Sequence, residues 1–143
     1  EVTYHQHFGA RGFVASSTDP VDPQRALPGY RKTLAKHPVA PAQVDALIGW
    51  VRRTVQAGVT VLVYVPPRPP AMAAIEERAG WAEGTLRRRL EAAGAEWLSM
   101  PFQGLTSYDG SHLDAPSARR FSERLGARLA RVQMGQLGEA HAR

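Results

Sequence analysis

A chain of 143 residues, with 43% hydrophobic and 22% charged residues, fits a single soluble globular domain. The absence of cysteine excludes disulfide bonds, thiolate metal sites and cysteine nucleophiles. No apolar run approaches the roughly 20 residues that span a bilayer, so we expect no membrane span. The net charge of +5 raises the question of nucleic acid. Apart from Phe121, however, no aromatic residue is interleaved with the arginines at 87–89 and 119–131, so we interpret them as a solvated helical face and do not expect nucleic acid as a partner.

Residues 1–40 predict an irregular N-terminal segment of the same domain. Its start could form a strand, whereas the Ser-Ser-Thr-Asp-Pro run at 16–20 and the prolines that follow favour a loop. His5 and His7 would lie on one face of such a strand, but no third ligand stands at metal-binding spacing nearby, so no metal site is predicted. The segment around Tyr30 fits either a short helix or an extended arm.

The sequence predicts no particular cellular compartment. No signal peptide is recognisable in these residues, and cysteine-free proteins occur in every compartment. The chain begins with Glu1 instead of Met, which is compatible with a preceding or removed N-terminal segment.

The hydrophobic pattern becomes regular at 41–57. Apolar residues recur there at steps of three and four, with charged residues between them, which predicts an amphipathic helix that ends at Gly58. The β-branched run at 59–65 follows without polar alternation, as is typical of a strand buried on both faces in a parallel sheet. Four prolines within 66–70 end this strand. Because open α/β sheets bind ligands beyond the carboxyl ends of their strands, this loop could border a site or simply stiffen the exit.

The same cycle repeats once toward the C-terminus. Helices are predicted at 71–78 and 81–93, with a short strand at 95–100 ended by proline. With the preceding helix and strand, these elements belong to an α/β core that we place at 41–134.

A closing helix is predicted after the last strand. Asp114 stands where it can cap this helix, Pro116 falls in its first turn, and an apolar stripe continues to a predicted end near Val132. Residues 135–143 are expected to form a flexible tail.

Between the last strand and the closing helix, the stretch 107–116 places an acid three residues before a histidine. An imidazole can take or give a proton near neutral pH, and a nearby carboxylate can fix its tautomer and stabilise its charged form. Asp109 and His112 are therefore candidates for a general base with its orienting partner. The same pair could instead be a loop staple, in which the carboxylate accepts hydrogen bonds from turn amides.

The order of the predicted elements resembles the C-terminal part of the SGNH hydrolase superfamily, also called GDSL-type esterases and lipases. Three features, which together cover roughly 41–132, carry the resemblance. The Asp-Gly-Ser-His run at 109–112 looks like the block that completes the serine triad of this family. The run at 113–121 is similar to the helix that follows that block, and the strand at 59–65 arrives after a helix that ends in glycine.

The resemblance implies a fold and the roles of two residues. The fold would be a three-layer α/β/α sandwich with a mainly parallel, flavodoxin-like sheet, incomplete at its N-terminal side. His112 would be the general base that activates a serine hydroxyl, and Asp109 would orient it. Gly110 and Ser111 would only shape the turn. Neither a metal nor an organic cofactor is implied.

The family's nucleophile is not recognisable in this chain. It would lie near the N-terminus in a Gly-Asp-Ser type turn, and no such tripeptide occurs here. The sequence also contains no asparagine, which with a glycine assists the oxyanion in this family. Ser16 and Ser17 are the only early paired serines, and their surroundings predict a capped loop.

The expected function is therefore acyl-ester chemistry with an incomplete set of residues. An SGNH-type serine ester hydrolase or O-acyltransferase would act on a small-molecule or carbohydrate ester through an acyl-enzyme. Its serine would come from a missing N-terminal segment or from a second chain. The alternative is a non-catalytic binding or assembly module with the same fold.

Overall fold

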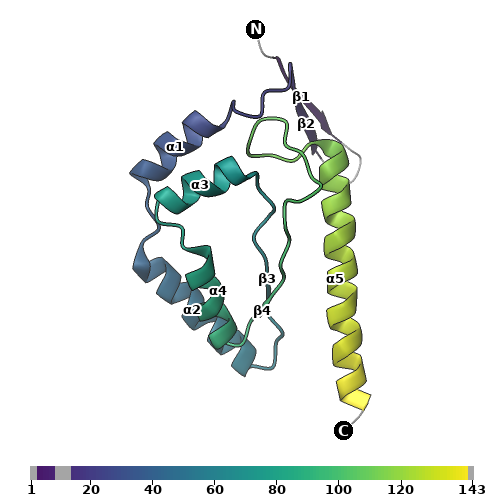
Figure 1. Ribbon diagram of the computed structural model, residues 1–143. Coiled ribbons are helices and arrows are strands. Elements are labelled where there is room, and N and C mark those ends of the chain that lie inside the picture. The colour runs from purple at the N-terminus through teal and green to yellow at the C-terminus, as the bar shows by residue number, and fades with distance from the viewer. Residues whose placement is uncertain (1–2, 9–13, 142–143) are drawn as a thin grey trace.

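The computed structural model describes residues 3–8 and 14–141, and over that part the chain is a mixed α/β protein with five helices and two two-stranded sheets (Figure 1). The predicted α/β class is therefore confirmed. In the part of the chain that is described, the parallel sheet has only two strands. The larger, mainly parallel sheet of a three-layer sandwich stays a prediction.

An antiparallel strand pair opens the chain. Strand β1 (Thr3–Phe8) pairs with strand β2 (Val14–Asp19) along their whole lengths. The strand expected near the N-terminus is confirmed, but the loop predicted at 16–20 is wrong, since most of that run belongs to β2. Serine and aspartate have weak β propensity, and here the backbone hydrogen bonds to β1 override it.

Helix α1 (Leu27–Lys36) follows and packs against helix α3 (Pro70–Arg78). Tyr30 therefore lies in a helix and not in an extended arm. The described part of the segment 1–40 is more regular than predicted. The two helices share a small apolar cluster, formed by Leu27, Met72 and Ile75. The start of α1 also contacts the loop that follows β4, because the N–H of Ala26 donates to the carbonyl of Asp109 at 2.9 Å.

The main core lies between two further helices and the parallel strands. It is shared by α2 (Pro41–Gln56), α4 (Glu83–Ala92), β3 (Leu62–Val63) and β4 (Glu96–Trp97). The helices predicted at these places are confirmed. Each buried Val, Leu or Ile side chain contributes about 1.5–3 kcal/mol. The buried members of this core are Ile48, Val51, Val61, Leu90, Ala93 and Ala95.

The run at 59–65 is less buried than predicted. Val61 is buried, but Val59 is 53% exposed and Tyr64 is 38% exposed, so the expected burial on both faces is wrong. Among the described residues, β3 has a neighbouring strand on one edge only, where β4 runs parallel to it. The ends of the run therefore remain in contact with solvent.

Helix α5 (Ala115–His141) lies on the other side of β3 and β4 from the remaining helices (Figure 1). Asp114 caps it as predicted, because its Oδ1 accepts a hydrogen bond of 2.8 Å from the backbone N–H of Ser117. The helix is longer than predicted, since it runs beyond Val132.

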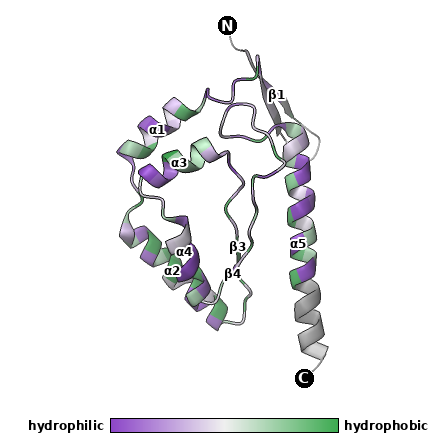
Figure 2. Cartoon of the chain, viewed as in Figure 1, coloured by the Kyte–Doolittle hydropathy of each residue, from purple (hydrophilic) through white to green (hydrophobic). Residues whose placement is uncertain are grey.

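Helix α5 is amphipathic over its described turns, with hydrophilic and hydrophobic residues alternating along it (Figure 2). Its Phe121 ring lies 5.9 Å from the ring of Tyr64, centroid to centroid, which joins α5 to the segment after β3. None of the described helices combines the length and the apolar character needed to cross a membrane.

Candidate active site

The candidate residues lie on a loop between β4 and α5 that is closed at its base. Ser107 and Leu113 form an antiparallel bridge, and the N–H of Tyr108 donates to the carbonyl of His112 at 3.2 Å. The chain thus turns back on itself within five residues, which brings the side chains at its tip together.

Asp109 and His112 are in direct contact at this tip. Nδ1 of His112 lies 2.7 Å from Oδ2 of Asp109. Because an ionised carboxylate can only accept, we assign the imidazole proton to Nδ1, and Nε2 is then the acceptor. The His112 side chain is 59% exposed, whereas that of Asp109 is only 11% exposed. Among the described residues, nothing forms a hydrogen bond with Nε2, so this nitrogen can accept a proton from a hydroxyl group.

Ser111 lies on the carboxylate side of the imidazole. Its Oγ is 2.8 Å from Nδ1 of His112 and donates to Asp109 at 3.2 and 3.3 Å, while its N–H donates to Oδ1 of Asp109 at 2.8 Å. A triad serine would have to approach Nε2 instead. Ser111 therefore stabilises the turn and is not placed as a nucleophile.

The Asp109 carboxylate is held in its ionised form. Burial alone would raise its pKa, but hydrogen bonds from the backbone N–H and Nδ1 of His112, and from the N–H of Ser111, lower the pKa below its ordinary value. An ionised Asp109 can stabilise the imidazolium that forms when His112 takes a proton.

The end of β2 and the segment between β2 and α1 donate hydrogen bonds to the loop. The carbonyl of Tyr108 accepts hydrogen bonds from the N–H of Asp22 at 3.1 Å and from Oγ1 of Thr18 at 3.4 Å, and the N–H of Ala26 donates to the carbonyl of Asp109 at 2.9 Å. The Tyr108 ring is buried and stacks on the imidazole of His112, with centroids 5.9 Å apart. The stacking on Tyr108 and the contact of Nδ1 with Asp109 hold the imidazole against the loop.

Sequence reasoning missed this support. The prolines of the segment indicate irregular structure, but a proline-rich connection of fixed shape can also support another loop. No periodic pattern marks such contacts, because they join groups 83 to 90 positions apart.

The other end of the loop is tied to the start of α5. Oδ2 of Asp114 accepts a hydrogen bond from the Thr106 hydroxyl, and Oγ of Ser117 accepts one from the N–H of Thr106 at 2.9 Å. Ser117 is fully buried. Burial would raise the pKa of Asp114, but the hydrogen bonds from Thr106 and Ser117 lower it below its ordinary value. The cap of α5 and the base of the loop are thus one hydrogen-bonded unit.

Stability is expected to fall at acidic pH because of these two carboxylates. The pKa values of Asp109 and Asp114 are lower in the folded protein than the value of about 3.9 for an unfolded chain. Their contribution is therefore fully present above about pH 5 and is lost as the pH falls through the folded-state values. Urea unfolding between pH 7 and pH 2.5 should show this loss. The double variant Asp109→Asn/Asp114→Asn should show a shallower pH dependence, and an unchanged slope would contradict the assignment.

No nucleophile for His112 is found in the described part of the chain. Ser17 is exposed on β2 and Ser16 is half-buried there, and neither forms a hydrogen bond with His112 among the residues described. The structure therefore brings Asp109 and His112 together, and the serine stays a prediction outside this chain.

The two histidines near the N-terminus, His5 and His7, both lie on β1. The His7 side chain lies outside the described residues, while His5 is exposed on β1. Within the described parts of the chain, no group of three or more histidine and carboxylate side chains is arranged to hold a metal ion.

The chain was also compared with known proteins. No protein-family model, no curated protein and no solved structure matches it.

Proposed function

We propose that this chain carries the acid–base pair of an SGNH-type serine ester hydrolase or O-acyltransferase. The observation that supports this most directly is the 2.7 Å contact between Asp109 and Nδ1 of an exposed imidazole, which leaves Nε2 of His112 as a proton acceptor. The resemblance of the Asp-Gly-Ser-His run to the family's last block supports the same chemistry. The substrate would be an ester of a small molecule or a carbohydrate.

In the proposed reaction, a serine Oγ bonds to the carbonyl carbon of the ester while its proton passes to Nε2 of His112. Asp109 stabilises the imidazolium. As the bond between the carbonyl carbon and the alcohol oxygen breaks, His112 returns the proton to that oxygen, and an acyl-serine remains. Water or an acceptor alcohol then attacks the acyl group with His112 again as base, which breaks the acyl-serine bond and restores the serine.

The serine would come from outside the described residues, on an N-terminal segment or a second chain. The same addition would complete the three-layer SGNH fold. Two features favour it: β3 and β4 are parallel with helices on both sides, and the partly exposed run at 59–65 has an edge on which a further strand could pair. Donors for the oxyanion would have to come from that added part as well.

Intact-protein mass spectrometry with a fluorophosphonate probe tests this proposal, because the probe reacts covalently with activated serines. We expect one probe per functional unit, on a polypeptide longer than these 143 residues or on a second polypeptide. The adduct should disappear in His112→Ala. It should persist in Ser111→Ala, since Ser111 lies on the Nδ1 side of the ring, and peptide mapping would locate the reacting serine.

A protein with the mass of these 143 residues and no adduct would count against catalysis. The second candidate function, a non-catalytic binding or assembly module, would then be the better account. One observation favours it: Oδ1 of Asp109 accepts the N–H groups of both Ser111 and His112, as a loop staple would.

A further inference from the structure

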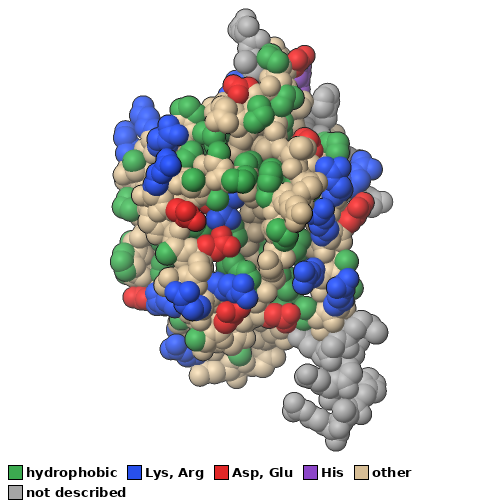
Figure 3. Space-filling model, in the orientation of Figure 1, with side chains coloured by type: hydrophobic (Ala, Val, Ile, Leu, Met, Phe, Trp, Pro, Cys, Tyr) green, Lys and Arg blue, Asp and Glu red, His purple; other side chains and the backbone are tan. Residues whose placement is uncertain are grey.

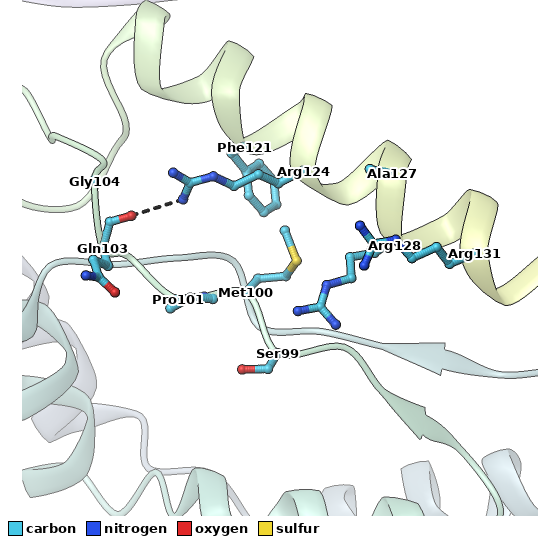
Figure 4. Close-up of a pocket in the computed structure, with 10 residues that line it drawn as sticks. All are labelled: Ser99, Met100, Pro101, Gln103, Gly104, Phe121, Arg124, Ala127, Arg128 and Arg131. Carbon is cyan, nitrogen blue, oxygen red and sulfur yellow. Dashed lines mark hydrogen bonds between the residues drawn. The ribbon is translucent and has the colours of Figure 1, made fainter.

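A groove of about 580 Å³ lies between α5 and the segment that follows β4 (Figure 4). Neither Asp109 nor His112 lines it. Met100, Pro101 and Phe121 contribute apolar surface, and no aspartate or glutamate is among its lining residues. Its charged lining consists of three arginines from α5, which are Arg124, Arg128 and Arg131.

These arginines form a row on one face of α5. Positions four and then three apart lie above one another on a helix, so the row extends about 10 Å along the axis. The Nη1 of Arg124 donates to the carbonyl of Gln103 at 3.0 Å, which holds this side chain across one end of the groove. Arg128 extends from α5 toward the segment that carries Met100 (Figure 4).

The row differs from the other arginine-rich segment, on α4. There Arg87 pairs with Glu91, and Arg89 pairs with Asp45. On the face shown in Figure 3, basic and acidic side chains are likewise interspersed. Among the described residues, no carboxylate pairs with the three arginines of the groove. Three like charges without a counter-charge repel one another, and an anion between them would relieve this repulsion.

We propose that this groove binds a small organic anion with two or more carboxylate, phosphate or sulfate groups. The guanidinium fork matches these groups with two parallel hydrogen bonds. The volume falls in the range of about 300–1,000 Å³ typical of small-molecule sites. Met100 and Phe121 suit the uncharged part of such a ligand. The groove shares no residue with the Asp109–His112 loop, so this proposal does not depend on the acyl-ester function.

Calorimetric titration of the purified protein at low ionic strength tests the proposal. The probes are citrate, pyrophosphate and a uronic acid trisaccharide, which separate carboxylate from phosphate recognition, with a neutral trisaccharide as control. We expect saturable binding of at least one anion and none of the neutral sugar. Arg128→Gln/Arg131→Gln should weaken that binding at least tenfold. Arg128→Lys/Arg131→Lys, which keeps the charge but loses the fork, should give an intermediate loss.

The matched control is Arg52→Gln/Arg53→Gln on α2, which removes the same charge from two exposed arginines outside the groove. It should change the affinity by less than twofold, and circular dichroism should show that each variant is folded. Absence of saturable binding, or an equal loss in both glutamine variants, would overturn the proposal. So would tighter binding of a short single-stranded DNA than of all three anions through the same arginines, because the groove would then be part of a nucleic-acid surface.

Discussion

Replacing Asp109 by asparagine is expected to lower the rate of serine acylation by a factor on the order of 10³–10⁴. An amide in place of the carboxylate presents an N–H₂ group or a weaker acceptor to Nδ1 of His112, which now lies 2.7 Å from Oδ2. The proton then moves to Nε2, the nitrogen that would accept the serine proton in the proposed reaction. The rate of fluorophosphonate labelling, measured on the assembly that contains the serine, reports this loss.

Asp114→Asn is the matched control for that experiment. The chemical change is the same, but Asp114 caps α5 and contacts Thr106 and Ser117 instead of the imidazole. Because asparagine caps helices about as well as aspartate, the variant should stay folded and keep a labelling rate within a few-fold of wild type. Nitrogen chemical shifts of His112 should also show the change of tautomer in Asp109→Asn only. Labelling of Asp109→Asn at the wild-type rate would show that the pair is a loop staple without a catalytic role.

Gly110→Ala is expected to destabilise the protein by roughly 2–5 kcal/mol. Gly110 has a φ of +92°, which L side chains rarely adopt, and an added Cβ would lie 2.2 Å from the carbonyl oxygen of Pro23 and 3.1 Å from Leu27. The loop and the segment behind it cannot both keep their positions. Urea unfolding at neutral pH measures the effect as a shift of the midpoint.

Gly126→Ala provides the comparison for this glycine. Gly126 lies within α5, and an added Cβ there would meet no atom within 4 Å. Alanine should stabilise the helix by about 0.5–1 kcal/mol, so the two substitutions should differ in sign. A small effect of Gly110→Ala would mean that the contact between this loop and Pro23 is not maintained in solution.

Much of the helical structure could be predicted because its signals are local. The helix at 41–57 follows from apolar steps of three and four residues, and the start of α5 follows from the cap at Asp114. The failures involve partners distant in sequence. The serines at 16 and 17 indicate a loop from the sequence, but their pairing with β1 makes them part of a strand. The burial of 59–65 depends on how many strands lie beside it. Local propensity contains no information about either.

In the candidate site, too, local contacts could be predicted from the sequence and contacts between distant residues could not. The contact between Asp109 and His112 was predictable, because only two residues of a turn lie between them and so short a chain has few ways to fold. The hydrogen bonds from Thr18, Asp22 and Ala26 were not predictable, since these residues are distant in sequence from the loop that they contact. The row of arginines on α5 follows from helical spacing. Only the tertiary structure places it beside the segment after β4 and away from any carboxylate among the described residues.

By itself, the sequence determined the α/β class, most helix positions and the acid–histidine pair, since each depends on residues a few positions apart. Only the tertiary structure decided which segment holds the loop and which arginines lack a counter-charge among the described residues. These properties depend on contacts across 20 to 90 positions, where chain connectivity restricts little and packing selects one arrangement among many.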